Sequence, residues 1–187
     1  MKQKNPTNRR KLHVEELNRV SIETFRGEKK IPLVMVLDNV RSQHNIGSVF
    51  RTADAFRVEE IILCGITATP PQAEIHKTAL GAEYSMKWRY FDDTLSAIEA
   101  LRDEGYKIYA IEQTEGSIPL QEITCDKEMK YAIVFGHEVH GVQQSVVDAS
   151  DGVIEIPQYG TKHSLNVSVT AGIVVWDFFN KLFSSFE

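Results

Sequence analysis

Apolar residues from position 31 onward form two alternating patterns, short continuous runs and amphipathic stretches. Runs rich in Val, Ile and Leu predict a buried strand at 33–37 and further strands at 60–64, 107–111, 131–135 and 153–156, and a short strand is predicted at 85–90. Helical spacing predicts helices at 47–56, 75–80, 94–104, 142–149 and 164–183. Ser164 is a candidate N-cap of the last helix, because its hydroxyl can accept a hydrogen bond from a backbone N–H. Strands that alternate with helices favour an α/β fold, with a mainly parallel sheet and helices on both faces.

The first thirty residues have a different pattern. Residues 1–12 are polar, and we expect them to be disordered in the isolated protein. Leu17, Val20 and Phe25 have roughly helical spacing and predict a short amphipathic helix at 13–26. The sequence therefore divides into an N-terminal arm, residues 1–30, and one domain, residues 31–187.

Charge is distributed unevenly between these two parts. Residues 1–30 hold nine Lys or Arg against four Asp or Glu, whereas the other 157 residues hold 12 against 22, for a net charge of −5. A basic arm on an acidic domain could bind phosphates, or it could simply be a solvated terminus.

The composition, with 42% hydrophobic and 25% charged residues in 187, is that of one soluble globular domain. No apolar run is long enough to span a membrane, and the N-terminus lacks the apolar segment of a secretory signal. We therefore expect a cytoplasmic location and no membrane partner. Cys64 and Cys125 form neither a metal-binding spacing nor a disulfide framework.

Three polar loops follow predicted strands, at 38–46, 136–141 and 158–163. Parallel α/β sheets bind ligands outside the carboxyl ends of their strands, so these loops predict a common site.

The first loop leads into a helix that carries Arg51. Asn45 and Gly47 can cap this helix, and a glycine lets backbone N–H groups approach an anion. The guanidinium of Arg51 can bind a nucleotide phosphate with two hydrogen bonds, or it can pair with Asp38 or Asp54.

The second loop reads FGHEVHG. Gly136 and Gly141 allow tight turns against a flat ligand. His137 and His140 suggest a metal, but no third ligand stands at a recognisable spacing, so no metal site is predicted. The dinucleotide, P-loop and G-x-S-x-G fingerprints are all absent.

The three loops together resemble the SpoU or TrmH-like branch of the SPOUT RNA methyltransferases over about residues 31–180. The resemblance rests on three motifs: N-x-G-x-x-x-R at Asn45, Gly47 and Arg51; FG-x-E-x-x-G at Gly136, Glu138 and Gly141; and IP followed by SLNVS at Ile156, Pro157, Ser164, Leu165 and Asn166.

This resemblance implies that S-adenosylmethionine donates a methyl group to a ribose 2′-hydroxyl of RNA, with tRNA the first candidate and rRNA the second. It implies a deep trefoil knot in the C-terminal part of the domain. It also implies a homodimer formed through the knot region and the C-terminal helix, with sites that combine residues of both subunits. The final helix is apolar on more than one face, through Trp176, Phe178, Phe179 and Phe183. Core packing accounts for one face, and a second apolar face agrees with such an interface.

Residue roles follow from the same resemblance. The catalytic residues would be Arg51, Asn45, Glu138, Ser164 and Asn166. The cofactor would be held by Ile111, Gly136, Glu138, Gly141, Ile156, Ser164 and Leu165. RNA would be contacted by Arg9, Arg10, Arg19, Arg51 and Lys77, although Lys77 could equally be a solvated lysine. His137 and His140, and the pair Lys162 and His163 before the SLN, depart from the common motif and bear on the choice of substrate.

Two alternatives from other functional classes remain open. One is a noncatalytic RNA-binding knot protein. The other is an enzyme acting on small nucleotides, which predicts no salt-sensitive affinity for RNA.

Overall fold

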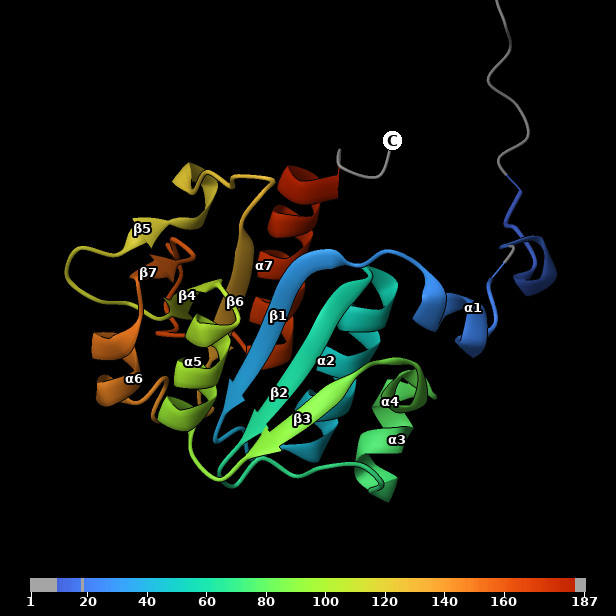
Figure 1. Cartoon of the computed structure of the whole chain (residues 1–187), viewed down its shortest axis with the longest axis horizontal. Helices are drawn as coiled ribbons and strands as arrows, with labels where there is room; N and C mark the ends of the chain where they lie inside the picture. Colours follow the sequence, from blue (N-terminus) through green and yellow to red (C-terminus); the bar gives the residue numbers. More distant parts are fainter. Residues whose placement is uncertain (1–9, 18, 184–187) are drawn as a thin grey trace, which may run out of the picture.

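The computed structural model describes residues 10–17 and 19–183. Its centre is a seven-stranded sheet in which all paired strands are parallel. The strands are β1 Ile31–Asp38, β2 Val58–Cys64, β3 Trp88–Phe91, β4 Tyr106–Ile111, β5 Ile118–Pro119, β6 Lys130–Phe135 and β7 Gly152–Glu155. Their order is β3-β2-β1-β6-β4-β7-β5 (Figure 1). The predicted parallel α/β sheet is confirmed.

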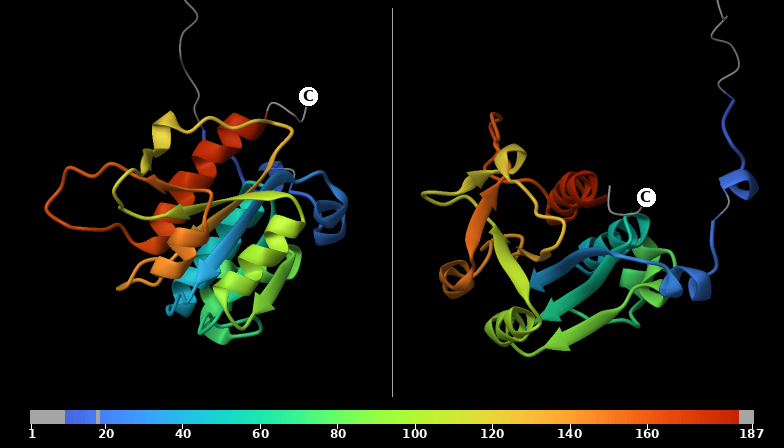
Figure 2. Two further views of the ribbon diagram at one scale, coloured as in Figure 1. Left: turned by 60° about the vertical axis from the view of Figure 1, so that its left-hand side comes forward. Right: turned by 45° about the horizontal axis from the view of Figure 1, so that its top comes forward.

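Helices cover both faces of the sheet (Figure 2). On one face lie α2 (Gln43–Ala55) and α7 (Val167–Leu182), and on the other lie α5 (Thr94–Asp103) and α6 (Gln144–Ala149). Because strand side chains alternate between faces, Met35 of β1 packs with α2 and α7 while Val36 packs with α5 and α6. Both side chains are fully buried, as expected for a strand covered on two sides.

The N-terminal segment is not the single helix predicted at 13–26. It forms a short 3₁₀ helix, η1 (Val14–Leu17), and a separate helix, α1 (Ile22–Gly27). Phe25 is buried in the main core, and Arg26 donates a hydrogen bond to the carbonyl of Tyr84 at the end of α4 (Ala82–Ser85). Leu17 is 44% exposed, so only the later part of the amphipathic pattern packs on the domain. Of the segment 1–12 predicted to be disordered, residues 1–9 lie outside the described residues.

Two helices begin at residues other than those predicted. The predicted 47–56 helix begins at Gln43, because the hydroxyl of Ser42 accepts a hydrogen bond from the amide of Asn45 at 3.3 Å. Neither Asn45 nor Gly47 is therefore the cap. The last helix begins at Val167, capped by Asn166, whose side chain accepts from the amide of Ser168 at 2.9 Å; the prediction of Ser164 as cap was wrong.

Gly47 serves the packing of α2 against α3 (Ala73–Ala79). A Cβ at Gly47 would lie 2.2 Å from the carbonyl oxygen of Ile75 and 2.2 Å from Oγ1 of Thr78. A glycine is required here for close approach of the helices, a different reason from the anion contact inferred above.

The remaining differences concern short elements. The predicted strand 85–90 is divided between the end of α4 and β3, and the two-residue strand β5 and the 3₁₀ helix η2 (Leu120–Glu122) had no predicted counterpart. The position of β6 between β1 and β4 matters most for the site, because it brings the loops after β1, β4, β6 and β7 together at one edge.

Candidate functional site

A cleft of about 660 Å³ opens at the carboxyl edge of the sheet. Its walls are the loops after β4, β6 and β7 and the first turn of α7. All seven residues predicted to hold the cofactor line it: Ile111, Gly136, Glu138, Gly141, Ile156, Ser164 and Leu165. Asn166 lines it as well, whereas Arg51 and Asn45 are outside its lining.

The loop after β6 folds into a tight turn. The amide of His137 donates to the carbonyl of Gly141 at 3.0 Å, and the amide of Gly141 donates to the carbonyl of His137 at 2.8 Å. A Cβ at Gly136 would lie 2.1 Å from the carbonyl carbon of Gly141, and Gly141 has φ +67°, a left-handed conformation. Both glycines are thus required by the loop itself, whether or not they also make room for a ligand.

Glu138 ties this turn to the start of α2. Its carboxylate accepts hydrogen bonds from the amides of Arg41 (3.0 Å) and Ser42 (2.9 Å) and from Nδ2 of Asn45 (2.9 Å). Burial raises the pKa of Glu138, but these hydrogen bonds outweigh burial and hold the pKa below its ordinary value of 4.5. The side chain is therefore an ionised anchor at neutral pH.

Asn45 connects all three predicted motifs. It donates to Glu138, and its Oδ1 accepts a hydrogen bond from Nδ2 of Asn166 at 3.2 Å. Asn166 uses its own Oδ1 to cap α7, so the order Asn166, Asn45, Glu138 forms one chain of hydrogen bonds across the edge of the sheet. Ser164 lies on the cleft wall, and among the described residues it makes no hydrogen bond to Asn166, Asn45 or Glu138.

Two further carboxylates support the same loops and were not predicted. Asp38, fully buried at the end of β1, accepts from Oγ1 of Thr94 (2.6 Å) and from the backbone and side-chain nitrogens of Gln143 (2.9 and 2.7 Å). Glu112, after β4, accepts from the amide of Val142 at 3.0 Å. A Cβ at Gly141 would lie 2.0 Å from Oε2 of Glu112. Asp38 and Glu112 each directly follow a predicted strand, and this position is the sequence signal that could have identified them.

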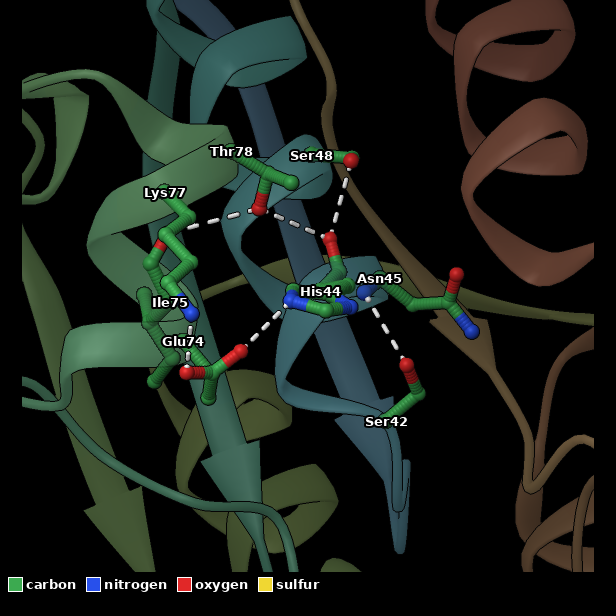
Figure 3. A network of polar contacts seen from close by, with 8 residues as sticks. All are labelled: Ser42, His44, Asn45, Ser48, Glu74, Ile75, Lys77 and Thr78. Carbon is green, nitrogen blue, oxygen red and sulfur yellow. Dashed lines mark hydrogen bonds and ion pairs between the residues drawn. The ribbon is translucent and has the colours of Figure 1, made fainter.

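Helix α2 also carries an exposed polar surface next to α3 (Figure 3). Nε2 of His44 pairs with Glu74 at 2.8 Å, and Nζ of Lys77 pairs with the other oxygen of Glu74 at 2.5 Å. The pKa of Glu74 is lowered by its hydrogen bonds with Lys77 and then His44. Lys77 is thus an exposed lysine that forms an ion pair with Glu74.

Arg51 lies on the same helix, less than two turns beyond Asn45. It is exposed, and within the described residues it has no ion pair or hydrogen bond, so the alternative pairing with Asp38 or Asp54 is not found. Of the other residues predicted to contact RNA, Arg10 pairs with Glu16, Arg19 is exposed, and Arg9 lies outside the described residues.

Within the described ranges, no group of three His, Cys, Asp or Glu side chains is arranged to hold a metal ion. Over the same ranges, no helix is both long and apolar enough to cross a membrane.

A parallel sheet with a cleft at its carboxyl edge is the arrangement in which α/β proteins bind ligands. Residues 32–176, most of the chain, match the model of the SpoU rRNA Methylase family. The chain belongs to this family of RNA methyltransferases, which confirms the resemblance predicted from the three motifs.

Two relatives illustrate the similarity. A protein assigned to the TrmH family of tRNA/rRNA methyltransferases from Staphylococcus saprophyticus is 32% identical over 156 residues, 83% of this chain and 61% of the relative. The tRNA (guanosine(18)-2′-O)-methyltransferase of Thermus thermophilus is 30% identical over 162 residues, 87% of this chain and 81% of the relative. The chain thus spans about three fifths of the staphylococcal protein's length.

Solved structures agree in fold. The TrmH/SpoU tRNA modifying enzyme of A. aeolicus superposes with a TM-score of 0.77 at 24% identity, over 88% of this chain and 83% of that one. The AdoMet-bound rRNA methyltransferase of Sinorhizobium meliloti gives a TM-score of 0.76 at 26% identity, over 84% of this chain and 60% of that one.

Proposed function

We propose that this protein transfers a methyl group from S-adenosylmethionine to a ribose 2′-hydroxyl of RNA, with tRNA as the first candidate substrate and rRNA as the second. The observation that carries the proposal is the hydrogen-bond chain from Asn166 through Asn45 to Glu138. These hydrogen bonds join the three motifs beside a cleft of the size of a small ligand. Asn45, at the centre of the chain of hydrogen bonds, lies on the helix that carries Arg51. The names of the Thermus and Sinorhizobium proteins support the same reaction class and cofactor.

The cleft suits S-adenosylmethionine in size and chemistry. A volume of about 660 Å³ lies within the usual range for small-molecule sites. Ile111, Ile156 and Leu165 offer apolar wall for an adenine ring, and Glu112 and Glu155 offer negative charge to a cofactor that carries a sulfonium and an ammonium group. When bound, the cofactor would supply the electrophilic methyl group.

The chain's own residues would position the acceptor ribose. A protonated arginine is a poor base but a good phosphate ligand, so Arg51 would hold the backbone phosphate and thereby place the adjacent 2′-hydroxyl. Asn45 would orient the same nucleotide, since its side chain is fixed on one side by Glu138 and on the other by Asn166. Holding the reacting groups in line can supply a large part of the rate enhancement.

We include a homodimer in the proposal. Val169, Ile173 and Trp176 form one stripe on α7 at helical spacing and are 51%, 39% and 53% exposed. Exposed apolar surface of this kind favours association. In such a dimer, residues of both subunits would contribute to the site. The C-terminal trefoil knot belongs to the same proposal and is supported by the late insertion of β6 between β1 and β4.

The experiment is transfer of a labelled methyl group from S-adenosylmethionine to total tRNA and to rRNA, followed by mapping of the modified ribose. We expect incorporation at a 2′-oxygen, RNA affinity that falls with salt, and loss of incorporation in Arg51→Ala. Cofactor affinity of the variant serves as the control for folding. Absence of incorporation into either pool, with cofactor binding intact, would favour a noncatalytic RNA-binding protein.

A further inference from the structure

Two imidazole rings stand together on the cleft wall. His137 and His140, both in the turn after β6, have ring centroids 4.8 Å apart and an interplanar angle of 35°. Both line the cleft, and His140 is exposed. The hydrogen-bond chain and the two glycines hold this turn, and among the described residues the ring of His140 makes no hydrogen bond, so this ring is an additional feature.

One ring of the pair is held by a hydrogen bond within the turn. Nδ1 of His137 accepts a hydrogen bond from the amide of Val139 at 3.0 Å. This fixes the orientation of the first ring and, in the neutral imidazole, leaves the proton on Nε2 as a donor. The two backbone hydrogen bonds between His137 and Gly141 close the turn, so the second ring is attached to a rigid element. A preorganised surface costs less entropy when a ligand binds.

The two histidines lie close to the place where the proposed function puts the acceptor nucleotide. Glu138, between the two histidines in sequence, is bonded to the start of α2 through Ser42 and Asn45. The rings therefore stand where the cleft meets the helix that carries Arg51. In the proposed reaction the acceptor ribose lies between these two places, and its base is one glycosidic bond away.

We propose that His137 and His140 form the subsite for the nucleobase of the methylated nucleotide, with the base stacked on the exposed face of His140. The inference rests on the proposed function and specifies its substrate as a nucleotide that is unpaired, or is unpaired on binding. Stacking of splayed-out bases on aromatic side chains, histidine included, is a general mode of RNA recognition. A base inside a duplex has no face free for such a contact.

The test is a double-mutant cycle between the protein and the RNA. Once the modified ribose has been mapped, kcat/KM is measured for RNA with its natural base and for RNA that is abasic at that nucleotide. We expect base removal to lower kcat/KM of the unchanged protein on the order of tenfold, the size found for one stacked base. His140→Ala should lower it similarly, and base removal should then cost this variant nothing more. His140→Phe, which keeps a ring face, should restore most of the loss.

His163→Ala is the matched control, because His163 also lines the cleft but makes no ring contact with the pair among the described residues. In this variant base removal should still cost about tenfold. An equal cost of base removal in His140→Ala and in the unchanged protein would overturn the inference. So would a loss of S-adenosylmethionine affinity in His140→Ala as large as its loss of kcat/KM, since the pair would then belong to the cofactor. Either result leaves methylation itself intact, whereas no methylation of any RNA would contradict the proposed function first.

Discussion

Replacement of Glu138 by glutamine tests whether its carboxylate is the anchor that joins the cofactor loop to α2. One carboxylate oxygen accepts from Ser42 and Asn45 and the other from Arg41. Glutamine keeps a single acceptor, so one hydrogen bond is lost and an NH₂ group faces the amide of Arg41. Hydrogen bonds to a charged group contribute about 1.5–3 kcal/mol each, and water can reach the exposed Arg41. We therefore expect a loss of about 2 kcal/mol in the free energy of unfolding.

Thermal and denaturant unfolding measure this loss. For a domain of this size, 2 kcal/mol corresponds to a decrease of roughly 4–8 °C in Tm. Glu155→Gln is the control: it makes the same change of charge on the cleft wall, but the side-chain carboxylate of Glu155 accepts no hydrogen bond from the described residues. This variant should stay within about 0.5 kcal/mol of the unchanged protein.

The loss should also depend on pH. The pKa of Glu138 is lowered in the folded state, so its contribution is present above the unfolded value and is lost as pH falls through the folded pKa. The stability difference between the unchanged protein and Glu138→Gln should be constant near neutral pH and should shrink in acid, below 4.5. Equal stability of Glu138→Gln and Glu155→Gln at pH 7, or a difference that grows in acid, would refute this account of the anchor.

Three further predictions concern the turn, the arginine and the dimer. In denaturant unfolding, Gly136→Ala should destabilise the protein by about 2–4 kcal/mol, because the added Cβ meets backbone atoms. Gly172→Ala, in α7, should instead stabilise it by about 0.5–1 kcal/mol, because the added Cβ enters open space. Equal changes in the stability of the two variants would contradict the close contact at Gly136. Arg51→Lys should lower kcat/KM of methyl transfer by about 100-fold, because lysine cannot hold the backbone phosphate with two hydrogen bonds in the same position. Near-full activity of this variant would exclude Arg51 as the residue that positions the phosphate. Sedimentation at micromolar protein should give twice 21.2 kDa, and Trp176→Asp should shift it toward the monomer; a monomeric unchanged protein would remove the proposed interface.

The regular part of the fold was predictable because it depends on local pattern. Runs such as 131–135 are short, apolar and bounded by polar residues, and β6 occupies Lys130–Phe135. The caps were less predictable, since several candidates stand side by side. Ser164 and Asn166 are both good N-caps by type, and only the backbone geometry selects Asn166.

The contacts that build the site could not be derived from spacing. Asn45 and Glu138 are 93 positions apart, and Asn45 and Asn166 are 121 apart. Motif resemblance indicated that these residues belong to one site, but not that they bond to one another. Gly47 was predicted as a helix cap, but it lies inside α2, and its close neighbours are on α3, to which the sequence gives no distance.

The place of β6 has a consequence for how the chain reaches its native state. β1 can pair with β2 once both are synthesised, but its partner at the other edge is β6, which emerges much later. The contact between Asp38 and Gln143 likewise spans 105 positions. Contacts of such long sequence separation slow folding, because the entropy of closing the loop must be paid first. During synthesis at about 5–20 residues per second, that apolar edge is open for several seconds. The half of the chain that carries the cleft is thus also the half that protects this edge from pairing with other chains.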